Sequence, residues 1–128
     1  MKNTYLNNLA NKIHSDNVDR GFYDTPRELG TMLMLVVSEL SEAMEADRTR
    51  LYNNCDTLLP DKIPSPNSNK FVQWFKDNVK DTFNDEIADA IIRLLDICSF
   101  YGIDIDRHIK LKLAYNKTRG YRHGGKKY

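Results

Sequence analysis

Two pairs of acidic residues are the side chains whose types and spacing best suit chemistry. Glu39 and Glu42 form the first pair, and Glu86 and Asp89 form the second. Residues three positions apart lie on the same side of an α-helix, so each pair presents two carboxylates together. If the two helices that carry them face each other, four carboxylates converge on one site.

Divalent cations compensate such a cluster, because buried like charges otherwise repel one another. Oxygen-only ligands favour Mg²⁺ or Mn²⁺ over zinc and copper. A di-iron bundle would need Glu-x-x-His pairs on two helices, and no His of this chain has Glu three residues before it. Either acidic pair alone is a weak signal, since solvated helix faces are rich in acids, but the two together indicate a metal site.

A third group of side chains shares one face of the last predicted helix: Lys112, Asn116 and Arg119, with Tyr115 beside them. Arginine binds phosphate through planar bidentate donors and lysine binds it as a point charge. The alternative is an ordinary basic helix end that complements the helix dipole, which we favour for Lys117 and Lys126. For Lys112 and Arg119 we favour a phosphate ligand.

The net charge of +1 conceals an asymmetry along the chain. Eight of the 19 Lys and Arg residues and none of the 18 Asp and Glu residues lie from Arg107 onward, which leaves 11 basic and 18 acidic residues before it. A basic segment beside an acidic body suits an anionic ligand held through metal ions and cations. A solvated basic tail that contacts nucleic acid is the alternative.

Nucleotide-binding and nucleophile motifs of other kinds are absent. The chain has no Gly-x4-Gly-Lys-Ser/Thr loop and no Gly-x-Ser-x-Gly elbow. Its two cysteines, Cys55 and Cys98, lie far apart and are interpreted as a loop thiol and a core thiol of a reducing compartment. The residues therefore indicate metal-assisted chemistry on a phosphate compound, without a covalent enzyme intermediate.

The elements that must position these residues are helices. Helical periodicity predicts an all-α fold, most simply a four-helix bundle with an additional short helix. The expected helices cover residues 3–14, about 26–48, about 82–101 and about 105–119, with a loop over 15–24 and the short helix after residue 70. No strand-like segment of any length is found.

Local signals predict where these helices begin, end and pack. Thr25-Pro26-Arg27-Glu28 is typical of a helix start with a capping box. Gly102 is expected to end the long helix, and Asp104 or Asp106 to cap the next one. The stripe expected to be buried on helix 26–48 consists of Leu29, Leu33, Val36, Leu40, Ala43 and Met44. The last helix is expected to pack through Ile105, Ile109 and Leu113.

The helix over 82–101 is apolar around most of its circumference and is expected to be largely buried. Its charged residues fall on one arc about 80° wide: Glu86, Asp89, Arg93 and Asp96. We expect Arg93 to orient a carboxylate or to contact phosphate.

Residues 1–128 are expected to form one domain, with a Pro-containing irregular insertion over 49–69 and a polar tail over 120–128. The longest apolar run, 32–37, is too short to span a membrane, and no signal-peptide core follows the N-terminus, so a cytoplasmic protein is expected. Trp74 is expected in the core or an interface. Phe22, Tyr23 and Trp74 are weaker candidates for base or sugar contacts.

The combination of Glu39-x-x-Glu42, Glu86-x-x-Asp89 and Lys112-x3-Asn116-x2-Arg119 resembles the MazG-like, all-α nucleoside triphosphate pyrophosphohydrolases, in their small single-domain phage and bacterial form. Residues 38–48 resemble the first metal helix of that family, 85–93 the second and 115–124 the C-terminal end. Two features differ: Ser38 stands where many members have Glu, and the segment between the acidic pairs is longer than usual.

The resemblance implies Mg²⁺-dependent hydrolysis of a nucleoside triphosphate, ribo or deoxy, between its α and β phosphates. It implies that Glu39, Glu42, Glu86 and Asp89 are the metal ligands and catalytic carboxylates, and that Lys112, Asn116 and Arg119 hold the nucleotide. From their positions on the predicted helices, we expect Tyr115 and Arg93 to be further substrate contacts. It also implies a homodimer or homotetramer. From the sequence we expect no membrane partner, and we favour a nucleotide over nucleic acid as the ligand. Glu39 or Glu42 is the expected proton acceptor.

Two alternatives stay open. Within the enzyme class, the chain would be a dUTPase-like relative or a pyrophosphohydrolase specific for a modified nucleotide. Outside it, the chain would be a non-catalytic bundle that binds nucleotide or nucleic acid through its basic end. Release of pyrophosphate with Mg²⁺, and its loss with EDTA, separates the first class from the second.

Overall fold

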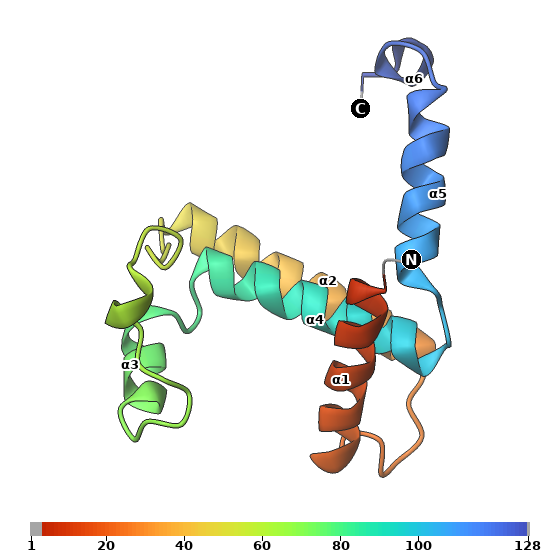
Figure 1. The fold of residues 1–128 in the computed structure, drawn as a ribbon. Helices are drawn as coiled ribbons and strands as arrows, with labels where there is room; N and C mark the ends of the chain where they lie inside the picture. Colours follow the sequence, from red (N-terminus) through yellow and green to blue (C-terminus); the bar gives the residue numbers. More distant parts are fainter. Residues whose placement is uncertain (1–3, 128) are drawn as a thin grey trace. The chain divides into compact units, whose positions relative to one another are not determined.

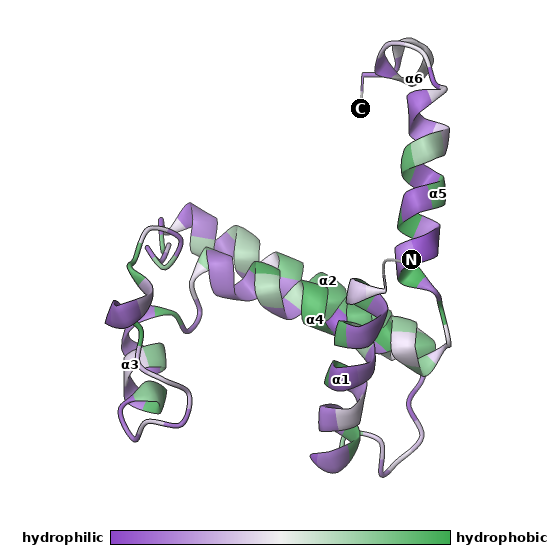
Figure 2. Cartoon of the chain, in the orientation of Figure 1, coloured by the Kyte–Doolittle hydropathy of each residue, from purple (hydrophilic) through white to green (hydrophobic). Residues whose placement is uncertain are grey.

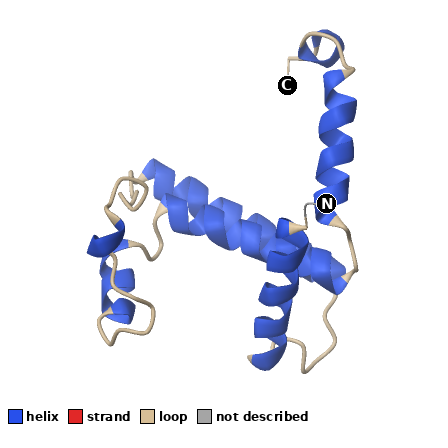
Figure 3. Cartoon of the chain, in the orientation of Figure 1, coloured by secondary structure: helices blue, strands red, loops and turns tan. Residues whose placement is uncertain are grey.

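The protein is all-helical in the computed structural model, which describes residues 4–127 apart from the side chain of His123. No strand occurs in this range, so the all-α expectation is confirmed (Figures 1 and 3). The elements, in order, are α1 (Tyr5–Asp19), α2 (Leu29–Arg48), the 3₁₀ turn η1 (Pro60–Lys62), α3 (Phe71–Asn78), α4 (Phe83–Phe100), α5 (Ile105–Lys117) and α6 (Arg122–Gly125). Among them, no helix combines the length and apolar character that crossing a membrane requires.

The chain divides into two compact units, which are described separately. Residues Arg27–Leu94 form what we call the α2–α4 unit. The chain up to Pro26, together with the chain from Leu95, forms the terminal unit. Helix α4 begins in the first unit and ends in the second.

In the α2–α4 unit, the two long helices lie side by side (Figure 1). The buried residues of α2 are Met32, Val36, Glu39, Ala43 and Ala46. The expected stripe is therefore only partly right: Val36 and Ala43 are buried, whereas Leu29, Leu33, Leu40 and Met44 are exposed. The reason is that α2 has apolar residues on more than one side, so periodicity alone did not identify the side that meets α4. On α4, Ile91, Ile92 and Leu94 are likewise exposed, so that helix is less buried than expected.

The start of α2 differs from its sequence signal. The helix begins at Leu29, with Glu28 in an extended conformation at the N-cap and no side-chain cap hydrogen bond. Thr25 therefore does not cap the helix, and the predicted capping box is wrong. Helix α1 runs to Asp19, so the expected loop over residues 15–24 begins later, at the turn where Gly21 adopts a φ of +84°.

In the terminal unit, hydrogen bonds from α1 hold the start of α5 in place. The Asn7 side chain donates to Asp104 Oδ1 at 2.8 Å and accepts from the backbone N–H of Ile105 at 2.9 Å. Asp104 also caps α5 by accepting from Arg107 N at 3.1 Å, and Gly102, with a φ of +66°, follows the end of α4. The expected stop and cap are therefore confirmed. On α5 itself, Ile109 and Leu113 are exposed, contrary to the packing expected of them.

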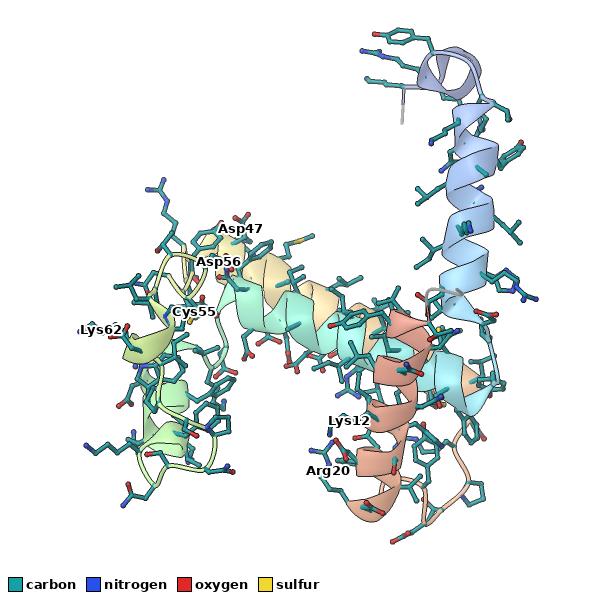
Figure 4. The ribbon with its side chains drawn as sticks, viewed as in Figure 1. Lys12, Arg20, Asp47, Cys55, Asp56 and Lys62 are labelled. Carbon is teal, nitrogen blue, oxygen red and sulfur yellow. The ribbon has the colours of Figure 1, made fainter. Side chains whose placement is uncertain are left out.

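The segment between α2 and α3 is irregular apart from η1, as expected for the insertion over 49–69. Near its start, the Tyr52 hydroxyl donates to Asp47, which is labelled with Cys55 and Asp56 in Figure 4. In α3 the rings of Phe71, Trp74 and Phe75 cluster, with centroids 6.2 and 6.0 Å from Phe71. The expected polar tail contains the short helix α6.

Candidate metal centre

Three carboxylates converge between α2 and α4. Glu39, Glu42 and Glu86 each offer an oxygen, and these oxygens all lie within 4.8 Å of one another. Glu39 and Glu86 are buried, whereas Glu42 is exposed. The structure thus brings together three of the four acids that the spacing singled out, two of them on α2 and one on α4.

Small buried side chains and a hydrogen-bonded loop position α2 and α4 relative to each other. Ala43 of α2 and Ala90 of α4 are both buried, and the small side chain of alanine allows a neighbouring helix to approach closely. The loop after α2 binds the start of α4, because Phe83 N donates to Leu51 O at 2.8 Å and the Asn53 side chain donates to Thr82 Oγ1 at 2.9 Å. These hydrogen bonds fix the start of α4, and so they fix where Glu86 lies along the length of α2.

Arg93 is the cation within this group. Its Nε donates to Glu39 Oε1 at 2.7 Å, and the Glu39 side chain is the more deeply buried partner. Arg93 lies two turns after Glu86 on α4, so its guanidinium reaches back over the acidic side of the helix pair. It orients one carboxylate and neutralises part of the local charge. Orienting a carboxylate is one of the two roles expected for Arg93.

The charge of the group is unequally distributed between Glu39 and Glu86. Burial raises the pKa of Glu86 to about 8, and its hydrogen bonds and charge interactions with Glu39 and Glu42 add to this effect. Burial also acts to raise the pKa of Glu39, but the hydrogen bonds from Arg93 and from its acidic neighbours outweigh it, so that pKa lies below its usual value. The two pKa shifts run in opposite directions, so protonation of this group is favoured at Glu86 over Glu39.

Asp89 lies next to the three-carboxylate group without belonging to it. Its side chain is half-buried, and its pKa is raised by burial and by the negative charges of Asp85 and Glu39. A carboxylate that is disfavoured by neighbouring anions gains most from an added cation. Asp89 is thus available as a further ligand at the edge of the group.

A second acidic group, which the sequence analysis missed, lies at the start of α4. Asp81, Asp85 and Glu86 also have oxygens within 4.8 Å of one another. Asp81 has a positive φ of 64°, and its N–H donates to Asp85 Oδ2 at 3.0 Å. The signal in the sequence was the acid-rich helix start itself, where carboxylates are common as partners of backbone N–H groups.

The residues expected to hold the nucleotide lie in the terminal unit. Lys112 Nζ is 5.0 Å from the centroid of the Tyr115 ring, and Arg119 Cζ is 5.8 Å from it, so the two cations flank one aromatic side chain. Asn116 Oδ1 is buried and has no hydrogen-bond partner among the described residues. Three of the four residues belong to α5, and Arg119 follows its end.

The terminal unit also contains a buried acid whose partners sequence reasoning did not find. Asp96 accepts a hydrogen bond from Tyr23 at 2.7 Å and lies 2.9 Å from His14 Nδ1. The ring centroids of His14 and Tyr23 are 4.5 Å apart, and Phe100 packs against both. Because 82 positions separate His14 from Asp96, no local pattern could have indicated this contact.

Comparisons with family models, with curated proteins and with solved structures found no match for this chain.

Proposed function

We propose that this protein is a Mg²⁺-dependent nucleoside triphosphate pyrophosphohydrolase of the MazG-like kind. It would cleave a nucleoside triphosphate, ribo or deoxy, between the α and β phosphates to give the monophosphate and pyrophosphate. The proposal includes the finer features that this activity entails: a four-helix-bundle-like pyrophosphohydrolase fold, a homodimer or homotetramer, and action in the cytoplasm.

The observation that carries the proposal is the convergence of Glu39, Glu42 and Glu86, whose oxygens lie within 4.8 Å of one another with two of the three side chains buried. Burial, and then the neighbouring Glu39 and Glu42, raise the pKa of Glu86 to about 8, as expected where negative charge exceeds what the surroundings neutralise. Perturbed carboxylates of this kind concentrate at functional sites. A divalent cation bound there would displace the proton and compensate the charge.

The side chains present fit such an ion. All the donors are carboxylate oxygens, which suits Mg²⁺ or Mn²⁺, and Glu39, Glu42 and Glu86 would hold it, with Asp89 as a further ligand. When bound, the ion would neutralise phosphate charge and make a water molecule more acidic.

The residues of the chain then have distinct roles. Arg93 holds Glu39 in one orientation through the 2.7 Å hydrogen bond. Glu39 or Glu42 would accept the proton of the attacking water. Within the terminal unit, Lys112, Asn116 and Arg119 would be the phosphate-binding side chains, with Tyr115 beside the two cations.

The test is a panel of canonical and modified nucleoside triphosphates, assayed with Mg²⁺ for release of monophosphate and pyrophosphate. The proposal expects both products, no activity in EDTA, and a preference among bases or sugars. Glu45→Gln is a matched control, because Glu45 is an exposed acid of the same helix that pairs with Arg48. Absence of pyrophosphate with every substrate, or turnover that persists in EDTA, would contradict the proposal. Salt-dependent retention of DNA or RNA without turnover would instead favour a nucleic-acid-binding bundle.

A further inference from the structure

Lys80, in the turn between α3 and α4, is a further cation beside the carboxylates of the α2–α4 unit. Its Nζ lies 2.8 Å from Asp81 Oδ2. Asp81 belongs to the second acidic group, which shares Glu86 with the three-carboxylate group. The hydrogen bond and charge of Asp81 raise the pKa of Lys80, and the negative charges of Asp85 and Glu86 add to this effect. A positive charge therefore lies beside the residues that would hold the metal ion.

The backbone around Lys80 is fixed by hydrogen bonds. Its N–H donates to Phe75 O at 2.9 Å, which ties Lys80 to the last turn of α3. On the other side, Thr82 is buried, and its hydroxyl donates to Val79 O at 2.6 Å. Asp81, between Lys80 and Thr82, adopts a φ of +64°. This ordered turn keeps the Lys80 side chain within reach of the acids.

Helix α3 supports this turn. Figure 2 shows hydrophobic and hydrophilic residues on this helix. The half-buried rings of Phe71, Trp74 and Phe75 contact one another on one side of it, whereas Lys76 is exposed. The long segment between the two acidic pairs thus ends in an ordered helix and turn that place Lys80 beside the carboxylates.

The two cations beside the carboxylates, Arg93 and Lys80, have partners of different burial. Arg93 Nε is bound at 2.7 Å to Glu39, whose side chain is only 11% exposed. In the other pair, the Lys80 side chain is 53% exposed and that of Asp81 is 65% exposed. Such an exposed pair contributes little to stability, because water screens both charges. A phosphate group can therefore replace Asp81 as the partner of Lys80 at small cost, whereas displacing Arg93 would leave a buried carboxylate unpaired.

We propose that Lys80 binds the phosphates of the nucleotide that leave as pyrophosphate. The inference rests on the proposed function and adds a substrate contact to it. In the reaction, the water oxygen bonds to the α-phosphorus and the proton of the water goes to Glu39 or Glu42. The bond from the α-phosphorus to the bridging oxygen breaks, and its electron pair leaves with the pyrophosphate. Lys80 donates hydrogen bonds to the pyrophosphate oxygens, neutralises part of their charge and keeps its own proton.

The position of Lys80 favours the leaving phosphates over the attacking water. Glu39 and Glu42, the expected proton acceptors, belong to α2, whereas Lys80 pairs with Asp81 at the start of α4. Glu86 belongs to both acidic groups and links the two positions. In phosphoryl transfer the attacking and leaving oxygens lie roughly in line, on opposite sides of the phosphorus. A cation at the end of the acidic site away from the proton acceptors suits the leaving side.

The test is the binding of inorganic pyrophosphate to the full chain in excess Mg²⁺, followed by calorimetry. The wild-type chain is expected to bind it, and Lys80→Gln to bind it at least about 10-fold more weakly, because a charge-assisted hydrogen bond is lost. Lys80→Arg keeps a charged donor and should bind within about 3-fold of the wild type. Lys76→Gln is the matched control, since Lys76 is an exposed lysine of α3 four positions earlier. It should bind pyrophosphate as the wild type does.

Binding of Mn²⁺ without pyrophosphate separates this contact from a structural role. Lys80→Gln should bind Mn²⁺ at least as tightly as the wild type, because it removes a positive charge beside the carboxylates. A loss of Mn²⁺ affinity would overturn the proposal, since Lys80 would then position the acids. Absence of pyrophosphate binding by the wild type would overturn it too, as would equal binding by Lys80→Gln or an equal loss in Lys76→Gln.

Turnover distinguishes a failure of this contact from a failure of the proposed activity. If Lys80→Gln hydrolyses a triphosphate with the kcat and KM of the wild type, the activity stands and the contact is wrong. If no triphosphate is hydrolysed but Lys80→Gln still binds pyrophosphate more weakly than the wild type, the contact stands and the activity is wrong.

Discussion

Helix α4 buries two acids, Glu86 and Asp96, in opposite kinds of surroundings. Asp96 is 7% exposed and is held by Tyr23 and His14. Glu86 is 5% exposed, but its neighbours Glu39 and Glu42 are acids like itself. Burial is therefore nearly equal, and the difference lies in the partners. A buried acid surrounded by donors stabilises a fold, whereas one surrounded by acids costs stability unless a cation or a proton compensates it.

From this difference we predict a structural role for Asp96 and a functional role for Glu86. Each role can be tested by removing one acid and measuring both activity and stability. The expected effects fall in order from loss of turnover to a small change in rate.

The largest effect is expected for Glu86→Gln. Removing this carboxylate takes away a metal ligand while keeping the size of the side chain, so pyrophosphate release should fall by about 100-fold or more. Helical circular dichroism should be unchanged. Near-normal turnover by this variant would remove Glu86 from the site.

The next effect concerns the pH dependence of stability without metal. The folded chain retains a proton on Glu86 that the unfolded chain releases, since the pKa rises from 4.5 to about 8 on folding. The free energy of unfolding in EDTA should therefore fall by about 1–3 kcal/mol as the pH rises through that window. The pKa of Glu39 lies below its usual value of 4.5, so the titration of Glu39 affects the free energy of unfolding at lower pH, outside this window.

Denaturant unfolding at several pH values measures this dependence. Glu86→Gln should abolish the decline, because the glutamine carries no titrating proton. Saturating Mg²⁺ should also oppose it by binding the folded state alone. A decline of equal size in the variant would show that other groups are responsible.

Asp96→Ala tests the structural acid. It leaves the Tyr23 hydroxyl and the His14 ring without their acceptor, which should lower the free energy of unfolding by about 1–3 kcal/mol. Glu86→Gln, measured in EDTA at neutral pH, should show no such loss, since the neutral glutamine replaces a carboxyl whose raised pKa of about 8 favours its neutral form at that pH. If the two variants changed stability alike, the distinction between the two acids would be wrong.

The smallest effect is expected for Arg93→Lys. The charge is kept but the planar Nε donor to Glu39 is lost, so turnover should fall by only about 3- to 10-fold. The measurement is kcat at saturating Mg²⁺. A loss as large as that of Glu86→Gln would mean that Arg93 contacts the substrate instead of orienting Glu39.

Some of this arrangement was predictable because helix geometry is local. Three-residue spacing placed Glu39 with Glu42 and pointed to Glu86 as their partner, and Gly102 and Asp104 marked a helix end and start from their own chemistry. Whether the four-helix bundle and the roles of the site residues are right stays a prediction.

Other features depended on contacts that no local pattern encodes. The side of α2 that meets α4 was misassigned at Leu33 and Leu40 because apolar residues occupy both candidate sides. The capping signal at Thr25 was not used, since α2 starts at Leu29. The partners of Asp96 come from α1 and the turn after it, far away in the sequence.

Binding of Mn²⁺, followed by calorimetry or electron paramagnetic resonance, tests the central claim most directly, because it needs no substrate. The account predicts that the wild-type chain and Asp96→Asn bind the ion alike and that Glu86→Gln loses at least about 10-fold in affinity. Equal binding by all three chains, or no binding by the wild type, would contradict it.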